Sequence, residues 1–106
     1  MIKIDVYKDS LGLINGCKIV GHAGLAESGQ DIVCSAISIL AYTTASAVQQ
    51  LLNIQLDGET SPGRMEFFLT ANANDQTQLL FRTMLIGFTD VAQQYPKRVR
   101  ISEKRR

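Results

Sequence analysis

Polar and apolar side chains alternate along the first residues of the chain. The apolar positions are Ile2, Ile4 and Val6, and charged or polar residues separate them. A period of two places every second side chain on one face, so this segment predicts a half-buried strand. Ser10-Leu11-Gly12 supplies turn-forming residues, and LINGCKIVG at 13–21 predicts a second strand. The two strands are expected to form a hairpin.

Two later segments repeat every three or four residues instead. One runs from Asp31 to about Asn53, and the other runs from Asn74 or Asp75 to Tyr95, where Pro96 ends it. This spacing places the apolar residues on one face of a helix, and Asn74 or Asp75 can cap the second helix. The positions expected to face the core are Val33, Ile37, Leu40, Thr44, Val48 and Leu51, followed by Leu80, Met84, Phe88, Val91 and Tyr95.

The remaining segments complete a mixed α and β pattern. A polar loop is expected at 55–63, a third strand at 64–72 with Met65, Phe67 and Leu69 on one side, and a short last strand at 98–102. The order ββαβαβ predicts an α+β fold, a two-layer α/β sandwich in which two helices cover one face of a four-stranded sheet. We expect residues 1–106 to form a single domain.

Composition excludes several classes of protein. No segment approaches the roughly 18 unbroken apolar residues of a membrane span, and no apolar stretch follows the N-terminus as in a signal peptide. A cytoplasmic protein without a membrane partner is therefore expected. Cys17, His22 and Cys34 lack the paired spacing of zinc ligands, and two cysteines make no disulfide framework. We expect neither a metal nor a cofactor.

Charge is distributed unevenly along the chain. Residues 1–96 contain five basic and nine acidic residues, whereas 97–106 (KRVRISEKRR) contain six basic residues and one acidic residue. A basic tail on an acidic body can contact RNA or another phosphate-rich assembly. The plainer interpretation is a solvated end that contributes to solubility, and the sequence favours it over a contact with RNA.

The segment GHAGLAESGQDIVCSAIS at 21–38 carries the candidate chemistry. It holds His22 at the end of the second strand and Cys34 in the first turn of the first helix. A compact loop between them can bring an imidazole within reach of a thiol, as base activation of a nucleophile requires. The unpaired N–H groups and the dipole of a helix start favour the thiolate, and the N–H of Cys34 or Ser35 is a candidate oxyanion donor.

Other residues of this segment have candidate supporting roles. Gly21, Gly24 and Gly29 leave backbone free to approach a substrate. Asp31 suits a helix start and is also a candidate to orient His22. The plainer alternatives are that Cys34 is a small buried hydrophobe and that His22 is a surface or capping residue. Cys17, in mid-strand, is expected to serve packing, although a redox pair of Cys17 and Cys34 is a third possibility.

The same segment also has the spacing of a phosphate-binding loop. Gly24 and Gly29 are separated by four residues and lie between a strand and a helix. However, Gln30 and Asp31 replace the Lys and the Ser or Thr that hold phosphates and magnesium. Because Glu27 and Asp31 would repel a nucleotide, this interpretation is rejected.

Gly21-His22-Ala23, followed by Gly29-x-Asp31-Ile32-Val33-Cys34 and Ser38, resembles the ribosomal-processing cysteine protease family of Firmicutes and related bacteria. The likeness covers essentially the whole chain, including the hairpin and the helix that carries LLFRTMLIGF. One departure is Ser35, where the family more often has alanine. This change leaves the nucleophile and the base intact but could alter the oxyanion contact.

The resemblance implies a cysteine endopeptidase that removes the N-terminal extension of a large-subunit ribosomal protein, number twenty-seven. The cut would lie after aromatic residues and before a small one. Cys34 would be the nucleophile and His22 the general base and acid, with Asp31, Ser35 and Ser38 in support. The family also implies a homodimer, a glycine-rich substrate loop and no cofactor. The alternative is a non-catalytic ribosome-assembly or RNA-binding module that uses residues 97–106.

Overall fold

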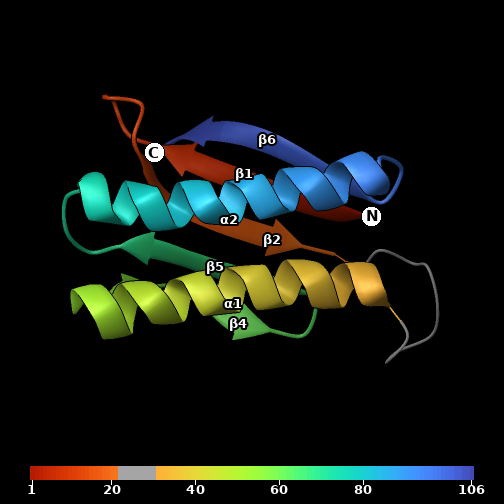
Figure 1. The fold of residues 1–106 in the computed structure, drawn as a ribbon, viewed down its shortest axis with the longest axis horizontal. Helices are drawn as coiled ribbons and strands as arrows, with labels where there is room; N and C mark the ends of the chain where they lie inside the picture. Colours follow the sequence, from red (N-terminus) through yellow and green to blue (C-terminus); the bar gives the residue numbers. More distant parts are fainter. Residues whose placement is uncertain (22–30) are drawn as a thin grey trace.

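The computed structural model describes residues 1–21 and 31–106. Two helices lie on one face of a sheet, so the fold is the expected α+β arrangement of two layers (Figure 1). The elements in chain order are β1 (Ile2–Lys8), β2 (Ile14–Val20), α1 (Ile32–Leu52), β3 (Leu56–Asp57), β4 (Thr60–Ser61), β5 (Arg64–Leu69), α2 (Asp75–Gln94) and β6 (Val99–Arg105).

Within residues 1–21 and 31–106 the sheet has six strands rather than the four predicted. Its order is β3-β5-β2-β1-β6, and β4 also pairs with β5. The two additional strands fall within the segment expected to be a loop, and each is only two residues long. A strand of that length is too short to show a period of two, so the sequence pattern could not reveal it.

The basic C-terminal segment forms an ordered strand, and most of its charged side chains are exposed. β6 pairs with β1 in parallel along its whole length, from Ile2 opposite Val99 to Lys8 opposite Arg105. The strand extends three residues beyond the predicted end at residue 102. β6 therefore lies along one edge of the sheet, beside β1 (Figure 1).

The core lies between the helices and the sheet. Alternate residues of β1 face it, as the period of two predicted, and Cys17 and Ile19 of β2 and Phe67 of β5 join them. α2 contributes Met84 and Phe88, as expected, together with Phe81, which the predicted face omitted. α1 is long and apolar enough to cross a membrane by length and composition alone. In the fold it packs against the core through Val33, Ile37, Ala41 and Val48.

Leu51 was predicted to face the core but is 72% exposed. Leu51 lies on the same side of α1 as the buried residue Val33, so the helical period predicted the side of the helix correctly. A helix of 21 residues is about 31 Å long. A strand of 7 residues spans only about 23 Å. The C-terminal end of α1 therefore extends beyond the sheet that would bury Leu51.

Candidate active site

The start of α1 places Cys34 beside the end of β2. Asp31 is the N-cap of α1, and its carboxylate Oδ1 accepts a hydrogen bond of 2.9 Å from the backbone N–H of Cys34. Cys34 is half-buried and packs against the core, so its thiol position is set by the first turn of the helix. This location at the helix start is the one that the sequence predicted.

A cavity of about 230 Å³ opens beside Cys34. Its lining includes Cys34, Ile37 and Ser38 from α1 and Gly21 from the end of β2. Ser38 is one helical turn after Cys34, so both lie on the same side of the helix. Two of the predicted supporting positions, Gly21 and Ser38, are therefore brought together with the candidate nucleophile.

Gly21 is held tightly at the wall of this cavity. Its φ of +105° favours glycine, and a Cβ placed there would lie 2.2 Å from the carbonyl oxygen of Met1. Its N–H donates a 2.9 Å hydrogen bond to the carbonyl of Gly63, just before β5. These contacts fix the backbone at the residue that precedes His22. His22, Gly24 and Gly29 lie outside the described residues, and so does any contact between Asp31 and His22.

The predicted oxyanion donors are both engaged in this structure. The N–H of Cys34 donates to the carboxylate of Asp31, and the N–H of Ser35 donates to the backbone carbonyl of Asp31 at 3.1 Å. A third partner would have to compete with these bonds. The use of these N–H groups as oxyanion donors stays a prediction, and it would require an oxyanion to compete with the capping bonds of Asp31. Ser35 is exposed and does not line the cavity.

The opposite wall of the cavity was not predicted. It comes from β4 and the start of β5, with Thr60, Ser61, Gly63 and Met65 among its residues. The only signal in the sequence was the turn-forming Ser-Pro-Gly at 61–63. That signal indicates a turn, but it does not say that the turn lies against the start of α1.

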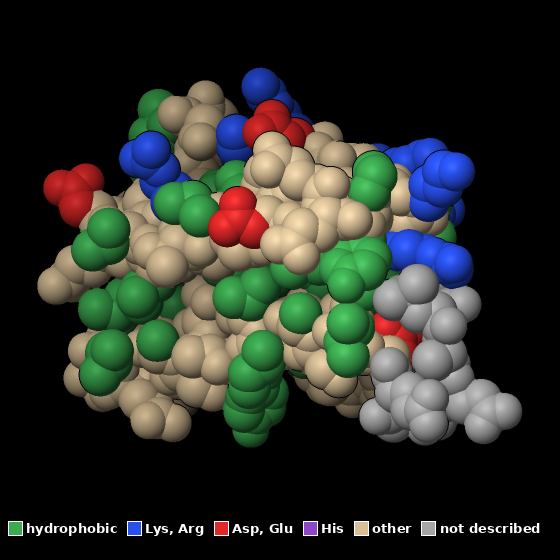
Figure 2. Space-filling model, turned by 45° about the vertical axis from the view of Figure 1, so that its right-hand side comes forward, with side chains coloured by type: hydrophobic (Ala, Val, Ile, Leu, Met, Phe, Trp, Pro, Cys, Tyr) green, Lys and Arg blue, Asp and Glu red, His purple; other side chains and the backbone are tan. Residues whose placement is uncertain are grey.

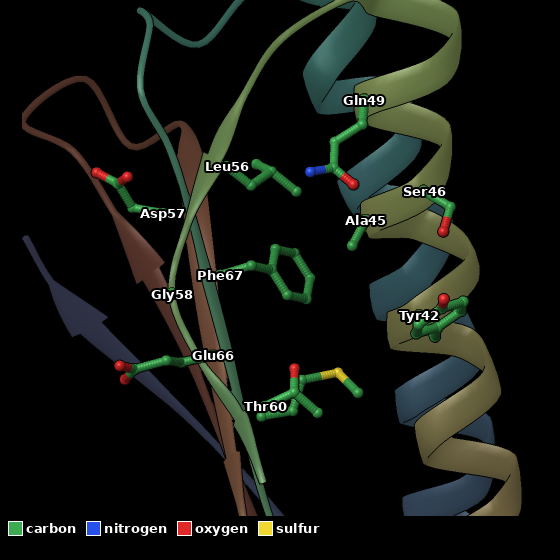
Figure 3. Close-up of a pocket in the computed structure, with 11 residues that line it drawn as sticks. Tyr42, Ala45, Ser46, Gln49, Leu56, Asp57, Gly58, Thr60, Glu66 and Phe67 are labelled. Carbon is green, nitrogen blue, oxygen red and sulfur yellow. The ribbon is translucent and has the colours of Figure 1, made fainter.

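A second cavity of about 180 Å³ continues from the first along α1. The two cavities share Thr60 and Met65. Figure 3 shows Leu56 and Phe67 pointing from the strands toward α1, where Ala45 and Gln49 face them. Asp57 and Glu66 point away from this space (Figure 3). The combined groove has both apolar and polar side chains in its walls and has Cys34 at one end.

Cys17 does not take part in the site. It lies in the middle of β2 with no exposed surface, and burial raises the pKa of its thiol to about 12. It forms no disulfide with Cys34. A thiol that is both protonated and shielded reacts slowly, so the prediction of a packing role is favoured over a redox pair.

Comparison with known proteins agrees with this geometry. A Staphylococcus aureus protein named ribosomal processing cysteine protease Prp is 26% identical over 98% of this chain and 100% of its own length. A Bacillus subtilis protein of the same name is 28% identical over 80% of this chain and 81% of its own length.

A solved structure also matches closely. It is the crystal structure of an S. aureus ribosomal processing protease Prp with a covalently linked product peptide, with a TM-score of 0.91 and 26% identity. The match covers 98% of this chain and 100% of that one. The family model described as cysteine protease Prp matches residues 1–100. The chain, with its thiol at a helix start beside a groove, therefore belongs to the cysteine protease Prp family.

Proposed function

We propose that this cysteine protease removes the N-terminal extension of a large-subunit ribosomal protein, number twenty-seven, with Cys34 as the nucleophile and His22 as the general base and acid. One observation carries the proposal. Cys34 and Gly21 line the same cavity, and His22 is the residue that follows Gly21. A relative solved with a substrate peptide, at 25% identity and a TM-score of 0.86, supports a peptide as the ligand.

The reaction follows from the chemistry of a thiol and an imidazole. His22 takes the proton of Cys34, and the thiolate attacks the scissile carbonyl carbon. The C–N bond then breaks, His22 returns the proton to the leaving amine, and a thioester remains on Cys34. Water deprotonated by His22 hydrolyses this thioester, which releases the carboxylate of the extension and regenerates the thiol.

The groove gives a physical basis for cleavage after aromatic residues. The peptide would lie between α1 and the strands β3, β4 and β5, with its scissile bond at Cys34. Aromatic side chains preceding the cut would lie beside the apolar residues Leu56, Met65 and Phe67. Burial of each ring there would contribute about 2 kcal/mol to binding.

The decisive experiment uses the full-length ribosomal substrate with its extension and reads the product by intact mass. Wild type is expected to release one defined N-terminal peptide, whereas Cys34→Ala and His22→Ala are not. Cys17→Ala is the matched control, because it removes the other thiol and should still cleave. Cleavage by Cys34→Ala would refute the proposed nucleophile, and an intact substrate with folded, reduced wild type would refute the proposed substrate.

The groove itself is tested by filling it. Ala45 faces the second cavity from α1, and Ala45→Leu would occupy space needed by an aromatic side chain. We expect KM to rise about tenfold with a smaller change in kcat. Thr43→Leu adds a similar side chain at an exposed position of α1 that lies outside the groove. Equal kinetics for the two variants would exclude this groove as the binding site.

A homodimer is also part of the proposal. Leu79 and Ile86 are 70% and 65% exposed on the outer face of α2, and hydrophobic side chains are spread over both helices in Figure 2. A second copy that covers these side chains would remove them from water. Sedimentation equilibrium of wild type and of Leu79→Glu/Ile86→Glu tests this. A monomeric wild type would contradict the dimer, and a dimeric double variant would exclude this face.

A further inference from the structure

The face of the sheet opposite the helices carries a group of residues that catalysis does not use. Strand pairing aligns Tyr7 of β1 with Gly16 of β2, and Gly16 with Phe68 of β5. On the other side of β1, Tyr7 is aligned with Lys104 of β6. Residues aligned in this way project from the same face, so one row crosses four strands. We call this surface the open face.

Two aromatic rings meet at the centre of the open face because Gly16 has no side chain. The rings of Tyr7 and Phe68 lie edge to face, with centroids 5.1 Å apart and an interplanar angle of 73°. A Cβ at Gly16 would lie 2.3 Å from Cδ1 of Phe68. Both rings are only half-buried. The glycine therefore allows two strands that are not neighbours to present their rings as one aromatic patch.

Positive charge surrounds this patch. The guanidinium of Arg106 lies over the ring of Phe68, 3.6 Å from its centroid. Strand pairing places both basic and acidic residues on the open face, and the basic residues outnumber the acidic ones. The basic residues are Lys3, Lys18, Arg64, Arg100, Lys104 and Arg106, and the acidic ones are Asp5, Asp57 and Glu66.

We propose that the open face binds single-stranded RNA, with the bases stacking at Tyr7 and Phe68 and the phosphates lying along the basic side chains of β6. This inference does not depend on the proposed peptidase substrate. Sheets that bind single-stranded RNA commonly stack two or three bases on aromatic side chains of their strands. Base stacking and cation–π contacts from arginine, together with a positively charged surface, are sufficient for such binding without sequence specificity.

The chemistry of the face favours RNA over other anionic partners. An acidic peptide would be attracted by the charges but has no planar bases to stack on the two half-buried rings. A membrane surface would require strongly exposed apolar side chains to insert. Among the described residues, the large apolar side chains with the greatest exposure lie outside the open face, on the helices, at Met1 and at Leu11.

The spacing of the strands also sets the length of RNA that the open face can contact. β5 and β6 are separated by β2 and β1, so about 14 Å of sheet lies between them at roughly 4.8 Å per strand. This distance accommodates two or three nucleotides. An unstructured basic tail would set no limit on the length of RNA. The charge of residues 97–106 alone therefore predicts a contact of any length, whereas the pairing of β6 with β1 predicts a short one.

Fluorescence anisotropy with a labelled 12-nucleotide oligouridine tests the proposal. Two phosphate contacts are removed in Arg100→Glu/Lys104→Glu, and one ring is replaced by an apolar side chain in Tyr7→Leu and in Phe68→Leu. We expect the charge variant to bind at least 30-fold more weakly and each ring variant about tenfold more weakly. Arg82→Glu is the matched control, because Arg82 is exposed on α2, and it should bind like wild type.

Three further measurements separate this proposal from its alternatives. With three phosphate contacts, affinity for the oligonucleotide should fall about 18-fold between 50 and 200 mM salt. Heparin, which has charge but no bases, should bind wild type and Phe68→Leu equally. Cys34→Ala should bind RNA like wild type, and the open-face variants should still cleave the peptide substrate.

Circular dichroism would first establish that each variant is folded. Ring variants that bind RNA like wild type would overturn the proposal, because the surface would then be only a site for polyanions. The proposal would also be overturned if Arg82→Glu weakened RNA binding as much as Arg100→Glu/Lys104→Glu. It would likewise be overturned if wild type did not bind the oligonucleotide at 50 mM salt.

Discussion

Cys34 lies half-buried in the first turn of α1 and lines a cavity, whereas Cys17 lies in the middle of β2 with no exposed surface. The two residues carry the same thiol. The helix start gives Cys34 access to a ligand and a polar backbone environment, while the sheet removes Cys17 from water and raises its pKa. Local structure, and not residue type, decides which thiol can act as a nucleophile.

Alkylation by iodoacetamide provides the sharpest test of this contrast. At pH 8 a thiol with a pKa of about 12 is about one part in 10⁴ thiolate. We expect Cys34 in the folded protein to react at least about 1000-fold faster than Cys17. Peptide mapping by mass spectrometry gives both rates, and in denaturant the two rates should become similar. Rapid labelling of Cys17 in the folded state would show that the comparison is wrong.

The dependence of stability on pH tests Cys17 alone. Folding raises its pKa from 9.0 to about 12, so the folded chain retains a proton that the unfolded chain loses. This contribution is complete below pH 9 and is lost as pH rises from 9 to 12, by a total of about 4 kcal/mol. Urea unfolding of wild type and Cys17→Ala between pH 8 and 11 measures it. The stability of wild type should fall more steeply, and parallel curves would contradict burial as the cause.

Gly21→Ala tests whether the strand that buries Cys17 also shapes the Cys34 cavity. The added Cβ would meet the carbonyl of Met1 in a backbone conformation that disfavours alanine. We expect a loss of about 2–3 kcal/mol in unfolding free energy together with slower alkylation of Cys34. Gly12 also has a positive φ, but a Cβ there has open space, so Gly12→Ala is the control for backbone strain alone. Equal losses in the two variants would rule out the steric contact.

The smallest expected effect concerns the cap of α1. Asp31→Ala removes the acceptor for the N–H of Cys34 and should cost about 1 kcal/mol, whereas Asp31→Asn retains a capping oxygen and should cost much less. Asn74→Ala removes the corresponding cap of α2 and should cost a similar amount without altering cleavage. Thermal unfolding and substrate cleavage are measured on all three. If Asp31→Asn is stable but inactive, the charge of Asp31 has a role beyond capping.

The sequence predicted most of the regular structure because long elements show their period. The hairpin, both helices, the third strand and the α+β class all followed from spacing, and the N-cap Asn74 was one of two candidates. The short strands β3 and β4 could not be found, since they exist only through pairing with β5. Leu51 was misplaced because periodicity says nothing about where the covering sheet ends.

The candidate site was predictable in part for a similar reason. Cys34 and Asp31 are close in the chain, so helix geometry alone relates them. The wall from Ser61 to Met65 and the aromatic contact between Tyr7 and Phe68 depend on strand order, which no local pattern specifies. The expected use of the Cys34 and Ser35 N–H groups stays a prediction, and Asp31 accepts hydrogen bonds from both of them in this structure.

The parallel pairing of β6 with β1 also has a consequence for synthesis. β1 is the first strand made and lies between β2 and β6, which is the last strand made. During translation one edge of β1 remains without its partner until residues 99–105 leave the ribosome. An unpaired strand edge is a site of aggregation, and such a long-range contact slows folding. Nascent chains that stop before β6 are therefore expected to be the species that most need a chaperone.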